Sequence, residues 1–288
     1  MHGKKAFLIL WASLAAAADF SGSSALKFTA DTVAFGPRPP GSAALGKLQR
    51  YIASSLKQCR CEVSEDAFTA ETPAGPVAMK NIIARFAGNS GRAIAVTGHY
   101  DTKVFREFRF VGANDAGAST GFLLEMARVL AGKPRKDDVY LVWFDGEEAF
   151  GEWSSTDGIY GSRHLAARWA ADGTAKRLKA LINVDMIGDK DLGILKDSYS
   201  SAVIGRLVWQ VAAELGYSRH FLNQATAIED DHIPFVRAGV PALDLIDFSY
   251  GADHSWWHTA EDTMDKLSAR SLQVVGDVLL ESIRRLEQ

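Results

Sequence analysis

Acidic and histidine side chains that could bind a metal follow several apolar segments of the sequence. His99-Tyr100-Asp101 follows a short β-rich segment, and Asp145-Gly146-Glu147-Glu148 follows the strongly apolar residues 139–144. Asp185 comes directly after a third apolar segment. Three acids within four residues beside a buried strand are electrostatically costly without a cation. Histidine, aspartate and glutamate are ligands that suit zinc. The pattern therefore indicates a metal site.

Two further segments offer ligands of the same kind. Asp115 lies in Gly112-Ala113-Asn114-Asp115, just before a predicted helix, and His258 lies near the C-terminus in Trp257-His258-Thr259. Taken alone, each signal is weak, because a single histidine is more often a hydrogen-bonded structural residue than a ligand. Asp115 could also simply stabilise a turn or cap the helix that follows. It is the combination with the acids after the apolar segments that favours metal chemistry.

Apolar segments alternate with helical patterns along the chain, which indicates how these side chains are positioned. Ser42 is a predicted helix N-cap, because Leu45, Leu48, Ile52 and Leu56 follow it at helical spacing. The predicted helices are 43–57, 117–130, 161–169, 202–215 and 269–286, and the predicted strands are 77–86, 93–98, 139–144, 181–184 and 240–246. This alternation predicts one domain with a largely parallel sheet and helices on both faces. In such sheets ligands bind outside the carboxyl ends of the strands, so the candidate residues should converge there.

The composition excludes some classes of function. The chain has 288 residues, 47 % of them hydrophobic and 23 % charged, and its formal net charge is −3. These values are ordinary for a soluble globular protein. No basic patch or run of Lys and Arg stands out, so we expect no nucleic-acid partner.

The N-terminus resembles a targeting segment. A short basic start, His2-Gly3-Lys4-Lys5, precedes the apolar residues 6–18 and small residues before Asp19. This apolar run is too short to span a bilayer, which needs roughly 20 residues. We therefore expect residues 1–18 to be a signal peptide and residues 19–288 a single domain. The mature protein should be secreted or periplasmic, monomeric and free of the membrane once the signal is removed.

Cys59 and Cys61 are separated by one residue. On a regular strand their side chains would point to opposite faces, so a disulfide between them would strain the backbone. No further Cys or His lies near them in the sequence to complete a metal site. We expect no structural role for this pair.

Longer strings of residues carry a resemblance to a known family. The strings are Gly98-His99-Tyr100-Asp101, Gly112-Ala113-Asn114-Asp115, Phe144 to Phe150 with Trp153, Tyr160 to Ala166, Asp185-Met186, Asp230 to Phe235 and Trp257-His258-Thr259. With them the sequence resembles the zinc aminopeptidase-type exopeptidases, and within these the glutaminyl-peptide cyclotransferases. The resemblance runs from Gly36-Pro37-Arg38-Pro39 to the last helix. It implies a single-domain three-layer αβα sandwich with a central, twisted, mixed but mostly parallel sheet.

The resemblance also implies roles for individual residues. One zinc ion would be held by Asp115, Glu148 and His258, with an open position for substrate or water. Glu147 would be the acid/base carboxylate, and Asp185 and Asp230 would form a hydrogen-bonded network around the reacting group. The implied substrate pocket is lined by Trp153, Ile228 and Trp257.

The implied reaction converts the N-terminal glutamine of a peptide or protein to pyroglutamate and releases ammonia. A two-zinc aminopeptidase is the main alternative, because His99 and Asp185 match the extra ligands that such enzymes use. A non-catalytic binding module on the same scaffold is a weaker alternative, because all five candidate metal positions are filled. One departure concerns Asp244, where we would expect a histidine in the animal enzymes. The network around Asp244 must therefore differ, and we assign it no role.

Overall fold

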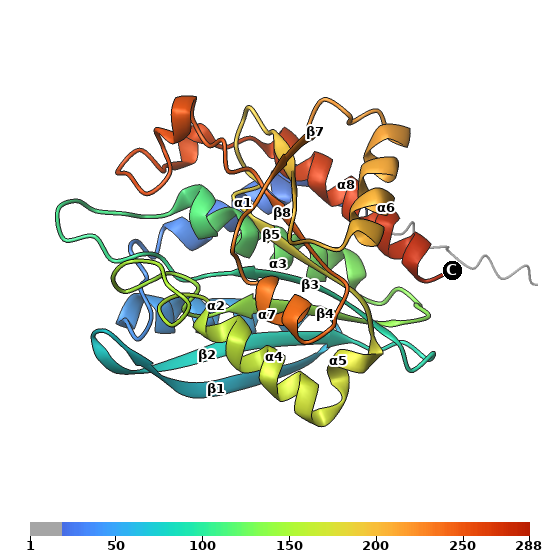
Figure 1. Cartoon of the computed structure of the whole chain (residues 1–288), viewed down its shortest axis with the longest axis horizontal. Coiled ribbons are helices and arrows are strands. Elements are labelled where there is room, and N and C mark those ends of the chain that lie inside the picture. Colours follow the sequence, from blue (N-terminus) through green and yellow to red (C-terminus); the bar gives the residue numbers. More distant parts are fainter. Residues whose placement is uncertain (1–18) are drawn as a thin grey trace, which may run out of the picture.

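The computed structural model describes residues 19–288 of the chain (Figure 1). The predicted signal peptide, residues 1–18, lies outside the described residues. Within the described part, no helix has both the length and the apolar character that a membrane crossing requires.

A six-stranded sheet runs through the described domain in the order β1-β2-β4-β3-β5-β8. The four strands β4, β3, β5 and β8 are parallel to one another, whereas β1 and β2 join this set through antiparallel pairing. Two more strands, β6 and β7, form a small separate parallel sheet. The bounds are β1 Glu62–Thr72, β2 Gly75–Phe86, β3 Ala93–His99, β4 Asp138–Phe144, β5 Leu178–Asp185, β6 Ile194–Asp197, β7 Phe221–Thr226 and β8 Ala242–Ile246.

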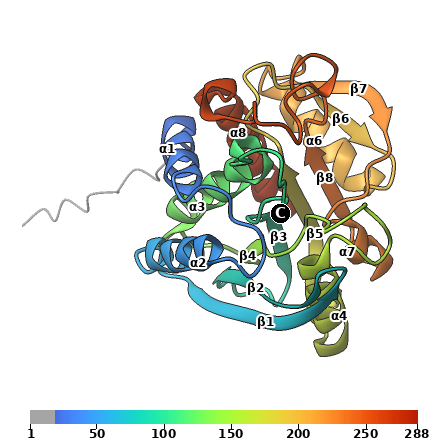
Figure 2. The same cartoon turned by 90° about the vertical axis from the view of Figure 1, so that its left-hand side faces the viewer.

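Helices cover both faces of the central sheet. Figure 2 shows α1, α3 and α8 on one side of the sheet and α4 and α7 on the other. The helices are α1 Gly22–Val33, α2 Ala43–Leu56, α3 Ser119–Leu130, α4 Tyr160–Asp172, α5 Thr174–Arg177, α6 Ala202–Glu214, α7 Ile233–Arg237 and α8 Ala269–Leu286, with short 3₁₀ turns at Ala252–His254 and Met264–Lys266. The predicted three-layer αβα sandwich with a mixed, mostly parallel sheet is confirmed.

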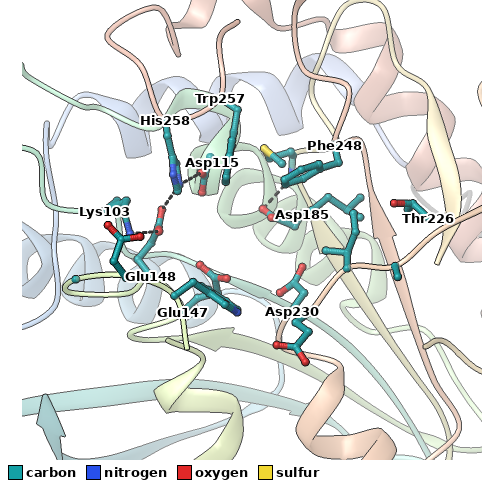
Figure 3. Close-up of a pocket in the computed structure, with 18 residues that line it drawn as sticks. Lys103, Asp115, Glu147, Glu148, Asp185, Thr226, Asp230, Phe248, Trp257 and His258 are labelled. Atoms are coloured by element: carbon teal, nitrogen blue, oxygen red, sulfur yellow. Dashed lines mark hydrogen bonds and ion pairs between the residues drawn. The ribbon is translucent and has the colours of Figure 1, made fainter. Parts of the chain in front are cut away.

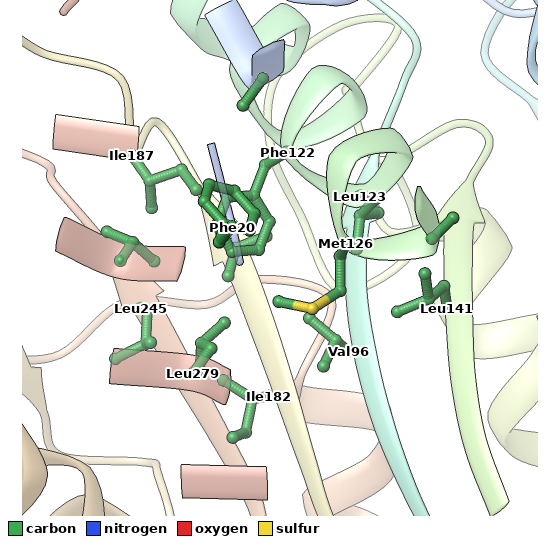
Figure 4. Close-up of a cluster of buried hydrophobic side chains, with 14 of the residues drawn as sticks. Phe20, Val96, Phe122, Leu123, Met126, Leu141, Ile182, Ile187, Leu245 and Leu279 are labelled. Carbon is green, nitrogen blue, oxygen red and sulfur yellow. The ribbon is translucent and has the colours of Figure 1, made fainter. Parts of the chain in front are cut away.

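The central strands are apolar throughout because both of their faces are buried. Successive side chains of a strand point to opposite faces, so the residues of β3 alternate between two cores. Ile94 and Val96 pack with the helices that include α3 and α8, whereas Ala93 and Ala95 pack toward α4. Figure 4 shows the larger core, in which Met126 of α3 lies over Val96 and Phe122 packs against Phe20. These two cores hold the strand ends at fixed positions.

Local signals in the sequence set several boundaries. Ser42 is the N-cap of α2, and its hydroxyl oxygen accepts a hydrogen bond from the Leu45 backbone N–H, as predicted. Six elements that the periodicity did not predict are α1, β1, α5, β6, β7 and α7. Helix α1 buries small and polar residues such as Ala25, Thr29 and Thr32, which make no clear apolar stripe. Strand β1 lies at the sheet edge and is mostly exposed, so its apolar signal is weak.

Cys59 and Cys61 lie between α2 and β1, not on a regular strand, and both are free thiols. Cys59 is buried in the larger core, and Cys61 packs against it at intermediate exposure. The pair forms no disulfide in this structure, and Cys59 fills space between α2 and its neighbours. A free cysteine commonly behaves as a small hydrophobic residue of this kind.

Candidate active site

The loops that follow the parallel strands meet at one edge of the central sheet. Because β4, β3, β5 and β8 are parallel neighbours, their carboxyl ends lie side by side at this edge. His99 ends β3 and Asp185 ends β5. Glu147 and Glu148 follow β4 after two residues. The sheet topology thus gathers residues that are far apart in the sequence.

Three predicted metal ligands meet at this edge: Asp115, Glu148 and His258. The His258 Nε2 atom lies 3.3 Å from Asp115 Oδ2 and 3.2 Å from Glu148 Oε1. One donor atom from each of the three residues lies within 4.8 Å of the other two. Asp115 lies in an irregular turn (Ala113–Ala118) before α3, and His258 lies in the long connection between β8 and α8. Figure 3 shows the three side chains pointing toward one another.

This donor group fits zinc. Zinc binds histidine nitrogen and carboxylate oxygen at about 2.0–2.2 Å, so two donors of a tetrahedral site stand about 3.3 Å apart. The measured separations of 3.2 and 3.3 Å from His258 Nε2 match that spacing. All three residues line a pocket, from which a fourth ligand could reach the metal as a catalytic zinc site requires.

A second donor group shares Asp115 with the first. His99 Nε2 lies 3.1 Å from Asp115 Oδ1 and 3.2 Å from Asp185 Oδ1. All three side chains of this group are buried, and His99 is only 1 % exposed. The other ring nitrogen, Nδ1, lies 3.5 Å from Asp101 Oδ1 and 3.8 Å from Glu147 Oε2. The Nε2 atom of His99 is thus within hydrogen-bond distance of two carboxylates, whereas its Nδ1 atom has no hydrogen-bond partner among residues 19–288.

The segment that carries both glutamates is fixed by neighbouring polar groups. The Asp101 carboxylate accepts hydrogen bonds from the backbone N–H groups of Glu147 and Glu148, at 3.1 and 3.3 Å. The Lys103 Nζ atom donates to the Ala149 carbonyl oxygen and lies 3.7 Å from Glu148 Oε2. Because Asp101 holds consecutive N–H groups, the two glutamate side chains diverge, one toward His258 and the other toward the pocket centre (Figure 3).

Burial and crowding shift the pKa values at this site. Burial raises the pKa of Glu147 well above its usual range, and the nearby charge of Glu148 adds to the rise. Burial likewise raises the pKa of Asp185 to about 7. Burial opposes protonation of His258, but Glu148 and Asp115 outweigh it and raise its pKa to about 10. In the metal-free protein a protonated imidazole thus offsets the two carboxylates, and a bound cation would replace that proton.

A pocket of about 520 Å³ opens beside the donor group. Asp115, Glu148 and His258 line one side of it, together with Trp257. Asp185 and Asp230 line the opposite side, and Glu147 lies between the two sides (Figure 3). The implied wall residues Trp153 and Ile228 also line the pocket, and Trp153 is 40 % exposed. All of the site residues predicted from the sequence therefore lie at this pocket or directly behind it.

Aromatic rings surround the imidazole of His258. Trp257 stacks on it with ring centroids 4.1 Å apart and an interplanar angle of 19°. Phe105 and Phe110 approach it edge-on, at 5.7 and 5.9 Å. Phe248 packs on Trp257 at 4.9 Å and lines the pocket. These phenylalanines were not predicted from the sequence. The position of Phe248 just after the last parallel strand did indicate that it lies at the edge of the sheet where the site forms.

Asp244 belongs to a separate buried polar cluster behind the pocket. Its Oδ1 atom accepts a hydrogen bond from Asn183, and its Oδ2 atom lies 4.0 Å from His232 Nδ1. The other nitrogen of that ring, Nε2, lies 3.0 Å from Asp197 Oδ2. Asp197 in turn accepts a hydrogen bond from the backbone N–H of Ile228, a pocket residue. The acid at position 244 thus accepts a hydrogen bond from Asn183 and lies near the buried His232.

Comparisons with known proteins agree with this architecture. A model of peptidase family M28 matches residues 81–283. The glutaminyl-peptide cyclotransferase of Drosophila melanogaster is 33 % identical over 252 residues, which cover 78 % of this chain and 70 % of the relative. The crystal structure of an Acidobacteriales bacterium glutaminyl cyclase superposes with a TM-score of 0.91 at 42 % identity and covers 99 % of both chains. A Zn-dependent exopeptidase from Parabacteroides distasonis superposes with a TM-score of 0.83 at 28 % identity, covering 93 % of this chain and 99 % of that one.

The fold and the donor group define an α/β enzyme of the metal-dependent exopeptidase class, with its site at the carboxyl edge of a mixed sheet. The chain belongs to peptidase family M28 and, within it, to the glutaminyl-peptide cyclotransferases. The resemblance read from the sequence is therefore confirmed.

Proposed function

We propose that the protein converts the N-terminal glutamine of peptides to pyroglutamate with release of ammonia, using one zinc ion per chain. The observation that carries this proposal is the convergence of Asp115, Glu148 and His258 at the wall of a pocket that also contains Glu147. The names of the relatives reported above support the same reaction. A zinc ion held by the three ligands would polarise the γ-carbonyl group of the glutamine side chain and stabilise charge on its oxygen.

Glu147 is the proposed proton carrier. The α-amino nitrogen of the substrate attacks its own γ-carbonyl carbon, a C–N bond forms, and the side-chain amide nitrogen leaves as ammonia. Glu147 takes the proton lost by the attacking nitrogen and returns it to the leaving nitrogen. Its raised pKa suits this exchange, because a proton carrier works best when its pKa is near the working pH.

Asp185 and Asp230 are proposed to hold the departing amide group. Both side chains line the pocket opposite the donor group. The Asp230 Oδ2 atom has no hydrogen-bond partner among the described residues 19–288, although it is buried. A buried carboxylate oxygen without a partner is costly, so a substrate N–H group that reaches it is well bound. Trp153, Ile228 and Trp257 would exclude water and hold the side chain in a conformation that can cyclise.

Two assays test this function together. Purified protein is incubated with a glutamine-initiated dipeptide and, separately, with a leucine anilide, while bound zinc is counted per chain. We expect ammonia and a pyroglutamyl peptide from the first substrate, an intact peptide bond and one zinc per chain. Free amino acid as the main product, with two zinc ions per chain, would instead support the two-metal aminopeptidase.

We also propose that residues 1–18 are a signal peptide and that residues 19–288 act outside the cytoplasm as a monomer. The basic start and the apolar run before Asp19 support the export step. N-terminal sequencing of the exported protein should give Asp19, and light scattering should give the mass of one chain. An N-terminus at Met1 or twice that mass would overturn these two points.

A further inference from the structure

The two loops that supply Asp115 and His258 are joined by a buried aspartate that neither the sequence patterns nor the proposed reaction assigns. Asp262 lies four residues after His258 and is 1 % exposed. Its own backbone N–H donates to the carbonyl oxygen of Thr259, the residue that follows His258. The backbone of Asp262 is therefore joined through a short turn to the residue that follows the histidine ligand.

The carboxylate of Asp262 reaches across to the loop of the other ligand. Its Oδ1 atom accepts a hydrogen bond from the backbone N–H of Asn114 at 2.8 Å, and its Oδ2 atom accepts one from the backbone N–H of Asp115 at 3.2 Å. The backbone N–H of Ala113 also donates to the Asp262 carbonyl oxygen at 3.4 Å. The backbone N–H groups of three consecutive residues thus all donate to Asp262, and the last of the three residues is the predicted metal ligand Asp115.

Tyr250 fixes the orientation of this carboxylate. Its buried hydroxyl group donates to Asp262 Oδ1 at 2.7 Å, and its ring packs edge-on against Trp256 at 5.5 Å. Asn114, one of the residues that Asp262 holds, also bonds to the segment after Asp185 through the Met186 carbonyl oxygen and the Gly188 N–H. The Asp262 carboxylate therefore lies at the junction of the segments that follow β3, β5 and β8.

A second aspartate on the other side of the site also accepts hydrogen bonds from consecutive backbone N–H groups. Asp101 holds the consecutive N–H groups of Glu147 and Glu148. Asp101 and Asp262 thus each fix the backbone of one ligand-bearing segment, and Asp262 differs because it is itself carried by the loop of a further ligand. Its bonds therefore set the distance between two ligands as well as the conformation of one segment.

We propose that Asp262 is a positioning residue for the metal, which holds the backbone of Asp115 at the separation from His258 that zinc requires. The inference rests on the proposed zinc site. Metal affinity depends on such supporting contacts because ligands that must be brought together on binding lose entropy, whereas ligands already held in place do not.

Asp262→Asn is the sharpest test, because it keeps the size of the side chain and removes one acceptor. Both carboxylate oxygens face backbone N–H groups. In the variant the amide NH₂ group must face one of these donors, so one hydrogen bond is lost and two donors oppose each other. Asp265→Asn is the matched control, because Asp265 lies three residues away, is exposed and pairs with Lys266.

The measurement is the zinc dissociation constant of the full chain, by competition with a chromogenic chelator, together with the melting temperature with and without zinc. We expect Asp262→Asn to bind zinc about 10–100-fold more weakly and Asp265→Asn to match the wild-type protein. The rise in melting temperature on adding zinc should be smaller in Asp262→Asn. A purely structural role would lower the melting temperature of the metal-free protein and leave the zinc dissociation constant unchanged, which would overturn the proposal.

Tyr250→Phe covers the case in which Asp262→Asn does not fold. It removes one donor to Asp262 Oδ1 and leaves the bonds to the Asn114 and Asp115 backbones, so a weakening of a few fold is expected. Unchanged zinc affinity in this variant would then overturn the inference. Failure of the proposed function and failure of the proposed role of Asp262 give different results. A wild-type protein that binds no zinc refutes the proposed function, whereas wild-type binding with unchanged affinity in the variants refutes only the role of Asp262.

Discussion

The two donor groups that share Asp115 use the same residue types and differ in what surrounds them. His258 is partly exposed to the pocket, and its Nε2 atom faces Asp115 and Glu148 from the side where a substrate would enter. His99 is fully enclosed beneath the pocket, and carboxylates lie at both of its ring nitrogens. All three residues of the first group line the pocket, whereas in the second group Asp115 and Asp185 line it and His99 lies behind them.

This difference shows that residue inventory alone does not define a metal site. An enclosed histidine with carboxylates near both ring nitrogens, as His99 has, can offset their charge. A histidine whose ring is held by aromatic contacts and whose nitrogen faces two carboxylates beside an open pocket is arranged as a ligand. We therefore expect zinc at the group that contains His258, and the variants below test that assignment.

The largest effect is expected from His258→Ala. This change removes the only nitrogen donor of the open group and leaves Asp115 and Glu148 facing each other. Zinc content should fall to near zero and cyclisation to the uncatalysed rate. If the variant still binds one zinc ion per chain, the metal site is the group that contains His99 and not the group that contains His258.

Glu147→Gln should have the next largest effect. It removes the proton carrier without removing a zinc ligand, so the catalytic rate constant should fall by about 10²–10⁴-fold while one zinc remains per chain. Steady-state cyclisation kinetics and metal analysis measure both quantities. Glu71→Gln, at an exposed position on β1, is the control for replacing a glutamate by a glutamine outside the pocket. Loss of zinc in Glu147→Gln would show that this residue is a ligand.

His99→Gln should show whether His99 supports Asp115 or binds a metal ion itself. One zinc per chain should remain, and cyclisation should weaken by about 10–100-fold because Asp115 loses a supporting hydrogen bond. Thermal unfolding should also show a loss of about 3–5 kcal/mol, since buried carboxylates lose their partner. Two zinc ions in the wild-type protein and one in His99→Gln would establish the two-metal alternative.

Trp153→Ala is expected to have the smallest effect. The side chain is 40 % exposed at the pocket wall, so its loss should change stability by no more than about 0.5 kcal/mol. It should raise the Michaelis constant by up to about tenfold through lost aromatic contact with the substrate. A large fall in melting temperature would show that Trp153 packs in the core instead of binding substrate.

The sequence predicted most of the elements that carry the site. The bounds of α8, Ala269–Leu286, follow directly from its periodicity, and Ser42 marks the start of α2. The strands that end near His99, Glu147 and Asp185 were visible because strands buried on both faces are continuous apolar runs. Helix α1 and strand β1 were missed, because one buries small and polar residues and the other is mostly exposed.

The supporting residues were not visible in the sequence. Asp262 follows His258 in a polar loop segment with no periodic pattern, and its partners, Asn114 and Asp115, lie 148 and 147 residues away. Phe105 and Phe110 lie in an irregular loop and pack on a histidine from the other end of the chain. Asp244 differs from the residue expected for the family, and only the structure places His232 beside it.

By itself, the sequence determined which residues could do the chemistry and that they stand at strand ends, since burial on two faces and helical periodicity are properties of neighbouring residues. Only the tertiary structure decided which carboxylates face which histidine, and which of the two histidines lines the pocket. The reason is that loop-to-loop hydrogen bonds join residues distant in the chain, and their geometry is set by how the strands and helices pack, not by any local pattern.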